Sequence, residues 1–148
     1  NCNPMLLLLT LFILSQFFGI GTGPDTEADK EADDIIGVFL TEDSAGKIEF
    51  YRRDGRYYGK VVAGERITKD VNNPDPALRE RSTLGMEFIQ NFEYDADEGV
   101  YQGGTIYNSQ NGKTYDGKIW LEDEGRTLKL RGYLGVFYRT VTWKRLEV

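Results

Sequence analysis

Histidine is absent from this 148-residue chain, and the only cysteine is Cys2. Histidine is the side chain most often used for acid–base catalysis near neutral pH, and it is also the commonest metal ligand. A single cysteine can form neither an internal disulfide nor a cysteine-based metal site. We therefore predict a protein that is not an enzyme and that needs neither a metal nor a cofactor.

Positive charge is also scarce, because 18 Lys and Arg residues stand against 24 Asp and Glu residues and leave a net charge of -6. A nucleic-acid-binding protein has to neutralise phosphates with a basic face. No segment of the sequence offers such a face. We predict no nucleic-acid partner.

The first charged residue is Asp25, and an almost wholly apolar stretch at residues 5–20 precedes it. Its length suits the apolar region of a secretory signal better than a bilayer span of about 20 residues. The small residues Gly19, Gly21 and Gly23 then offer a cleavage region. We predict a signal peptide over residues 1–23 and a secreted or periplasmic mature protein with no stable membrane insertion. The alternative is an uncleaved membrane anchor.

Residues 24–34 carry six acidic side chains against one lysine and no aromatic residue. Such a segment has little apolar surface to bury, so we predict a flexible, solvated tether ahead of a domain at residues 35–148.

Within that domain, short polar turns separate runs of alternating apolar and polar residues. The turns fall at residues 43–46, 54–55, 97–99, 111–112 and 123–125, and each contains Gly together with Asp or Asn, which tight hairpins favour. Between them the alternation predicts strands near residues 37–41, 48–51, 56–63, 85–94, 100–107, 113–121, 128–134 and 136–146. Eight antiparallel strands are enough to close an up-and-down β-barrel around packed side chains or one small ligand.

One connection is much longer than the other turns. Residues 64–84 contain the sequence NNPDP at 72–76, followed by a stretch that could form one helical turn. A loop of this length in a compact domain is usually functional or a structural cover. Asn73, Asp75, Arg79 and Arg81 are its candidate interaction residues. The alternative is a stiff plug in which Asn and Asp side chains bond nearby backbone.

Several of these segments match a known family in order along the chain. They are GVFLT at 37–41, YGKVV at 58–62, NPDP at 73–76 with Arg79 and Arg81, LG at 84–85, GTIY at 104–107, NGKTYDGK at 111–118, LRGYLG at 130–135 and RTVTW at 139–143. On these residues the chain resembles domain-of-unknown-function family 2147, small exported bacterial proteins. The resemblance implies a lipocalin-like barrel.

Arg139 is the sharpest candidate for a binding residue. It shares strand parity with Trp143, so if Trp143 faces the interior, the guanidinium does too, and an inward arginine can grip a carboxylate. Phe88 and Gln90 lie on the apolar face of their strand by the same alternation, and Tyr115 alternates in step with Ile119 and Leu121, so Gln90 and Tyr115 could complete a polar patch around the arginine. The alternative is that Arg139 only packs over an aromatic ring near the end of the barrel.

These observations predict a non-enzymatic binding module for a small apolar or amphipathic ligand. The alternative is a secreted or envelope protein-interaction domain whose barrel is filled by side chains. A hydrolase is a distant third possibility, because nearly every carboxylate falls in a turn or on a polar face.

Overall fold

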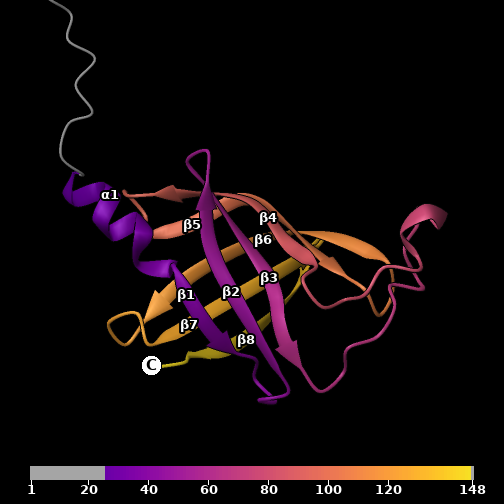
Figure 1. Ribbon diagram of the computed structural model, residues 1–148. Helices are drawn as coiled ribbons and strands as arrows, with labels where there is room; N and C mark the ends of the chain where they lie inside the picture. Colours follow the sequence, from indigo (N-terminus) through magenta and orange to yellow (C-terminus); the bar gives the residue numbers. More distant parts are fainter. Residues whose placement is uncertain (1–25, 148) are drawn as a thin grey trace, which may run out of the picture.

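Every alternating run forms a strand in the computed structural model, which describes residues 26–147 (Figure 1). The predicted signal peptide at residues 1–23 lies outside the described residues. The elements in chain order are α1 (Glu27–Ala32), the 3-10 helix η1 (Asp33–Ile35), β1 (Gly37–Leu40), β2 (Gly46–Arg53), β3 (Arg56–Gly64), the 3-10 helix η2 (Pro76–Leu78), β4 (Glu87–Asp95), β5 (Val100–Asn108), β6 (Lys113–Glu122), β7 (Thr127–Leu134) and β8 (Phe137–Arg145).

Each strand pairs antiparallel with the next along the chain, and β8 pairs with β1 to close the barrel. This confirms the predicted eight-stranded up-and-down barrel with one long Pro-containing loop. The short turns behave as their residues require. Asp54 and Gly55 join β2 to β3 with φ of 52° and 74°, the left-handed backbone that suits a two-residue hairpin.

The two ends of the barrel differ. Helix α1 lies at one end, which we call the closed end, together with the β2–β3, β4–β5 and β6–β7 turns (Figure 1). The opposite end, which we call the open end, carries the remaining hairpin turns and the long loop between β3 and β4.

Side chains fill the half of the barrel next to the closed end. Phe39 and Phe50 meet edge to face with ring centroids 5.6 Å apart, and Tyr57 meets Tyr101 in the same way at 5.2 Å. The buried core comprises Ile35, Phe39, Ile48, Phe50, Tyr57, Ile89, Phe92, Tyr101, Ile119, Leu128, Leu130 and Trp143. This packed half is a rigid base beneath the open half.

The acidic segment at residues 24–34 is predicted from its composition to be a flexible tether. In the structure, residues 27–35 form α1 and η1 instead. Thr26 begins the helix with a capping box in which its hydroxyl accepts from the Asp29 N–H and the Asp29 carboxylate accepts from the Thr26 N–H. The segment is then tied to the barrel. The Tyr101 hydroxyl donates to the Ala32 carbonyl at 2.7 Å, and Tyr57 donates to Asp33 at 2.7 Å. The amino-acid composition of the segment does not predict these contacts, because they are made by a backbone carbonyl and one carboxylate.

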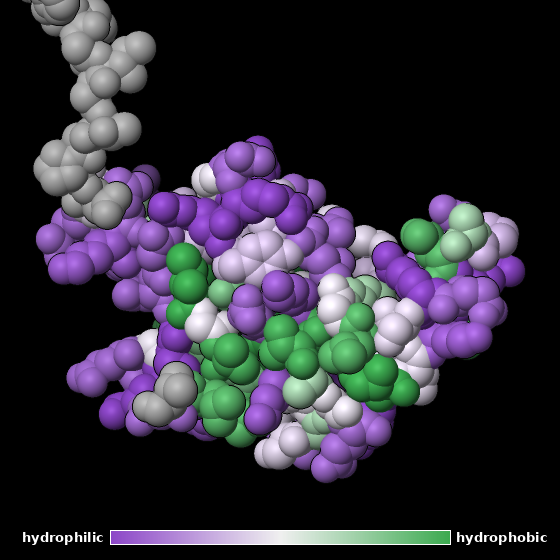
Figure 2. Space-filling model, viewed as in Figure 1, coloured by the Kyte–Doolittle hydropathy of each residue, from purple (hydrophilic) through white to green (hydrophobic). Residues whose placement is uncertain are grey.

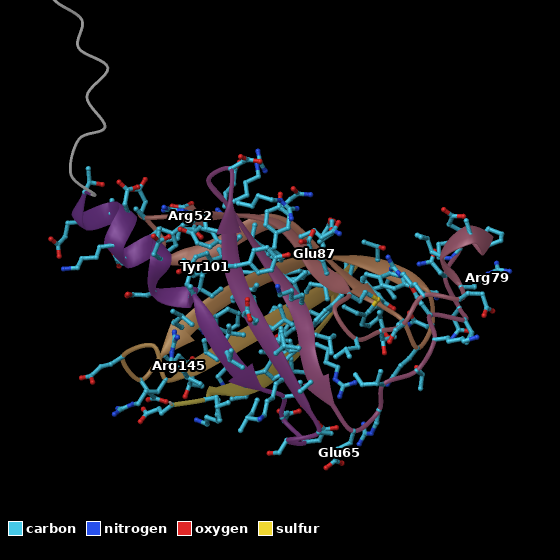
Figure 3. All side chains as sticks on the ribbon, viewed as in Figure 1. Arg52, Glu65, Arg79, Glu87, Tyr101 and Arg145 are labelled. Atoms are coloured by element: carbon cyan, nitrogen blue, oxygen red, sulfur yellow. The ribbon has the colours of Figure 1, made fainter. Side chains whose placement is uncertain are left out.

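Arg145 covers the closed end from the last strand. Its guanidinium lies 4.5 Å from the centre of the Phe39 ring and donates to the carbonyls of Gly125 (2.8 Å), Ile36 (2.9 Å) and Asp34. Figure 3 shows Arg145 and Tyr101 at the end of the barrel where α1 packs. The arginine that stacks on an aromatic ring at a barrel end is therefore Arg145.

A buried carboxylate anchors the long loop. Asp70 is fully buried and accepts hydrogen bonds from the Tyr107 hydroxyl (2.6 Å), the Asn73 amide (2.8 Å) and Arg81 Nε (2.9 Å). Burial alone would raise the pKa of Asp70, but these donors outweigh it and hold the pKa below its usual value. The loop is thereby fixed to β5.

The pairing that closes the barrel, between β1 and β8, is short. β1 is four residues long and pairs with β8 only through Phe39–Arg145 and Leu40–Lys144. Beyond Leu40 the chain turns away, which leaves a side slot between residues 41–43 and β8.

The outer surface is mostly hydrophilic around α1, whereas the far end of the long loop carries both hydrophilic and hydrophobic residues (Figure 2). Figure 2 also shows a band of hydrophobic surface across the face formed by β1, β2 and β3.

Candidate functional site: a cavity in the open half of the barrel

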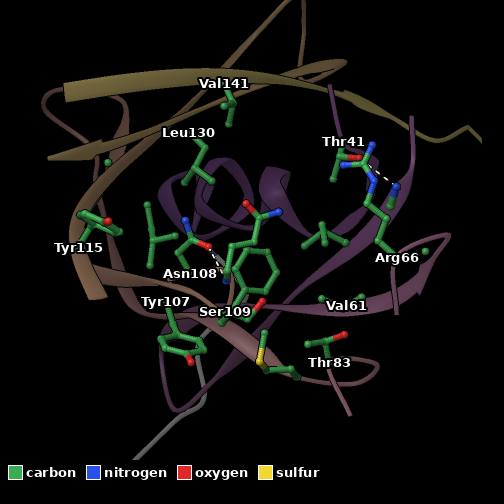
Figure 4. A pocket seen from close by; sticks show the side chains of 18 of the residues that line it. Thr41, Val61, Arg66, Thr83, Tyr107, Asn108, Ser109, Tyr115, Leu130 and Val141 are labelled. Atoms are coloured by element: carbon green, nitrogen blue, oxygen red, sulfur yellow. Dashed lines mark hydrogen bonds between the residues drawn. The ribbon is translucent and has the colours of Figure 1, made fainter. Parts of the chain in front are cut away.

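The open half of the barrel holds a cavity of about 760 Å³. Small-molecule sites in proteins typically fall between about 300 and 1,000 Å³. The view in Figure 4 looks into this cavity, and side chains such as Val61, Tyr115, Leu130 and Val141 reach toward it from different strands. The cavity is thus a property of the whole barrel wall and not of one loop.

The inner part of the cavity is apolar. Trp143 and Phe88 form its floor, with ring centroids 6.4 Å apart, and Trp143 rests on the buried Phe50 ring at 6.3 Å. The walls above this floor are Ile48, Val61, Met86, Ile106, Leu130 and Val141. An apolar group that enters the cavity is removed from water, which favours binding. The side chains that it contacts are held in place by the packed base.

The rim of the cavity is polar and carries an ion pair. Arg66 lies 2.9 Å from the Asp43 carboxylate. The Ala45 backbone N–H, and after it the Thr41 hydroxyl, lower the pKa of Asp43, so this acid is ionised at neutral pH. The two charges of the pair therefore largely cancel at the rim.

Arg139 also lines the rim. It faces the same side of β8 as Val141 and Trp143, because β7 and β8 pair without a bulge. It is exposed to solvent at the mouth and borders the side slot as well. No group within residues 26–147 accepts a hydrogen bond from its guanidinium or lies within ion-pair distance of it. Its expected alternative role, stacking on an aromatic ring, is filled by Arg145.

Tyr115 lines the cavity opposite β8, with Gly132 of β7 between them. The Asn111 amide donates to the Tyr115 hydroxyl at 2.8 Å, which leaves the phenolic proton available as a donor. Phe88, Tyr115, Arg139 and Trp143 are thus brought together around one space, as predicted from strand parity.

Gln90 does not belong to this group, and its predicted inward orientation is wrong. The pairing of β3 with β4 shifts register twice, and Asn91 has a positive φ of 61°. Ile89, which pairs with the cavity residue Ile106, takes the inward position, so Gln90 points to the other face and donates to the Glu87 carbonyl at 3.2 Å. A β-bulge reverses which alternate residues face inward.

The four candidate residues of the loop are used within the loop itself. Asn73 accepts from the Asp75 N–H at 2.9 Å, Asp75 accepts from the Ala77 N–H at 2.9 Å, and Arg79 donates to the Asn73 carbonyl at 2.8 Å. Arg81 is bound to Asp70. Figure 3 places Arg79 on the projecting end of the loop, away from the barrel. These contacts are the local side-chain-to-backbone bonds that are expected of a stiff segment.

Two residues that fix the loop escaped the sequence reasoning. Asp70 lies between Lys69 and Val71 in a segment that the sequence predicts to be an exposed loop. Tyr107 is one of several aromatic residues predicted to lie in a strand. No local pattern marks them as partners, because they are 37 residues apart and meet only in the folded barrel.

Within residues 26–147, no group of three or more Asp, Glu, His or Cys side chains could hold a metal ion. In the same part of the chain, no helix combines the length and the apolar character that crossing a membrane requires.

A closed eight-stranded barrel with one packed end and one hollow end defines a lipocalin-like protein. The chain belongs to the bacterial family described as "Uncharacterized protein conserved in bacteria (DUF2147)", whose family model matches residues 37–145. It is also similar to the solved structure of protein HP1028 from the human pathogen Helicobacter pylori, which is described as belonging to the lipocalin family. That likeness has 28% sequence identity and a TM-score of 0.68, and it covers 76% of this chain and 83% of that chain. A comparison with curated proteins finds no match.

Proposed function

We propose that this protein is a non-enzymatic binding module that holds one small apolar or amphipathic molecule in the open half of its barrel. The observation that carries the proposal is the division of the interior: side chains fill one half, and the other half is a cavity of about 760 Å³ with an apolar floor. A cavity above a rigid base is preorganised, so little ordering entropy opposes binding.

The candidate ligand contacts are Phe88 and Trp143 at the floor and Tyr115 and Arg139 at the rim. The two aromatic rings offer apolar surface, and the rim residues offer hydrogen-bond donors. Such a division suits a molecule with one apolar and one polar end.

We also propose that the protein acts outside the cytoplasm, in the periplasm or as a secreted protein. The apolar stretch at residues 5–20 and the resemblance to exported bacterial proteins support this location.

Trp143 offers a direct test, because the chain contains only two tryptophans and the other, Trp120, lies on the outer wall. In a Trp120→Phe variant, the neutral apolar probe N-phenyl-1-naphthylamine should bind and quench Trp143 emission. A saturable change is expected, and its absence would refute a binding cavity.

A matched pair of variants locates the probe. Val141 faces the cavity and Thr142 faces outward on the same strand. Val141→Phe should weaken probe binding about tenfold by occupying part of the space. Thr142→Phe adds the same ring to the outer wall and should leave binding unchanged. Thermal melts establish that both variants fold.

A second candidate function is supported by the β7–β8 hairpin. Its tip exposes Leu134, Val136, Phe137 and Tyr138, with Val136 89% exposed. A cluster of large exposed apolar side chains often marks a protein-interaction surface. Crosslinking in the source cell tests this function: partners lost on changing Val136 and Phe137 to Ser would favour an interaction domain, and unchanged partners would exclude this surface.

A further inference from the structure

We propose that the molecule held in the cavity is a carboxylate amphiphile, with its head group between Arg139 and Tyr115 above Gly132 and its tail on the Phe88–Trp143 floor. This inference rests on the proposed binding function, and it adds the charge, the orientation and the seat of the ligand.

The seat is defined by a missing side chain. Gly132 pairs directly with Arg139 across β7 and β8. A Cβ built on Gly132 would make only ordinary van der Waals contacts, with Tyr115 Cβ at 3.8 Å and Ile106 Cδ1 at 4.0 Å, and Gly132 itself lines the cavity. Arg139 and Tyr115 flank this space from the two neighbouring strands, and both line the cavity.

Arg139 gives the seat its positive charge, because the other cationic side chains of β7 and β8 already have hydrogen-bond partners. Lys129 donates to Thr142 (2.7 Å), Arg131 to Thr140 (2.8 Å) and Lys144 to Thr127 (2.8 Å). Arg145 is held at the closed end by three carbonyls. Among the cationic side chains of β7 and β8, only Arg139 has no hydrogen-bond or ion-pair partner within residues 26–147.

The remaining charged residues around the cavity favour a single negative charge on the ligand. Asp43 and Arg66 pair with each other, and Glu42 borders the side slot next to Arg139. A carboxylate balances the one unpaired guanidinium and can accept two parallel hydrogen bonds from it. A doubly charged phosphate would leave excess negative charge beside Glu42 and Asp43.

Strand geometry sets the orientation. Arg139 and Trp143 are four residues apart on β8, which at about 3.3 Å per residue places the rim about 13 Å from the floor along the strand. Arg139 is exposed where the mouth and the side slot meet, which keeps a bound head group in contact with water. The apolar floor then receives the tail.

Titration calorimetry with dodecanoate and dodecan-1-ol at pH 8 tests the inference, because the two probes share a tail and differ in head group. The wild-type protein should bind dodecanoate about tenfold more tightly than dodecan-1-ol, the ratio expected for a solvent-exposed charge-assisted pair. Arg139→Gln should remove that preference, because dodecanoate loses the charge-assisted pair and the two probes then bind with similar affinity. Lys144→Gln, which removes a cation outside the cavity, should keep the preference.

A second variant acts on the seat without changing charge. Gly132→Val places a branched side chain at this position and should weaken dodecanoate binding more than dodecan-1-ol binding. Equal wild-type affinities for the two probes would overturn the carboxylate assignment while leaving the binding function intact. A preference for dodecanoate that survives in Arg139→Gln would overturn the seat. Binding of neither probe, together with no binding of N-phenyl-1-naphthylamine, would overturn the proposed function itself.

Discussion

Replacing Asp70 by Asn should loosen the long loop and destabilise the barrel. The Asp70 carboxylate accepts from Tyr107, from Asn73 and from Arg81 through both Nε and Nη2, the last at 2.9 Å. An Asn side chain has one acceptor oxygen, so it can keep at most two of these four bonds, and its own amide protons then face donors.

The magnitude follows from the bonds lost. A hydrogen bond to a charged group contributes about 1.5–3 kcal/mol, but the Arg81 side chain is 38% exposed, so water replaces part of what it loses. We expect Asp70→Asn to cost about 2–3 kcal/mol. At about 4 °C per kcal/mol for a domain of this size, Tm should fall by about 8–12 °C.

The difference between wild type and Asp70→Asn should also depend on pH. Because the folded state lowers the pKa of Asp70, the carboxylate stabilises the fold fully above its unfolded pKa of about 3.9. That stabilisation is lost as the pH falls below about 4 and through the folded pKa. The two proteins should therefore differ most at neutral pH and converge in acid.

Circular dichroism melts measure the stability, and limited trypsin digestion at Arg79 and Arg81 measures the loop. Asp97→Asn is the control, because Asp97 is an exposed turn residue and its removal changes the net charge equally. If Asp70→Asn melts with the wild type and its loop is cleaved no faster, the buried carboxylate does not anchor the loop.

Three further predictions concern the packed half of the barrel. Gly104→Ala should cost about 1–3 kcal/mol, because a Cβ there would overlap the Phe92 ring, whereas Gly132→Ala meets only ordinary contacts and should melt like the wild type. Equal melts of the two variants would contradict the close approach. Arg145→Gln should cost about 2 kcal/mol through the lost ring contact and charged donors. Lys144→Gln is its control, and the reasoning fails if both changes are neutral. Burial, and then the hydrogen bond to Asp33, raise the pKa of Tyr57 to about 12. Its neutral phenol therefore stabilises the fold below pH of about 10, and this stabilisation is lost as the pH rises toward 12. In a difference titration of wild type against Tyr57→Phe, a midpoint near pH 10 would refute this environment.

The regular strands could be predicted from the sequence because their evidence is local. The alternation of apolar and polar residues and the Asp-Gly turns determine the hairpins. Because β7 and β8 pair without a bulge, Arg139 faces the same side of β8 as the inward Trp143. Tyr115 reaches the cavity by the same logic, because β6 and β7 also pair without a bulge.

The failures arise where distant parts of the fold decide the outcome. The bulges in β4 reversed the side on which Gln90 points, and alternation alone cannot locate a bulge. The acidic segment became a helix because Thr26 caps it and because Tyr101 and Tyr57 hold it from the barrel. The role of Asp70 could not be predicted for the same reason, since Asp70 lies in the long loop and its partner Tyr107 lies 37 residues away on β5.

Native mass spectrometry of the protein purified from the cells that make it tests the central claim most directly. The wild-type protein should carry one bound small molecule, and Val141→Phe, which occupies part of the cavity, should lose it. Thr142→Phe, which carries the same added ring on the outer wall, should retain it. A wild-type protein with an unliganded mass, or a bound molecule retained equally in both variants, would contradict a ligand-binding cavity in the open half of the barrel.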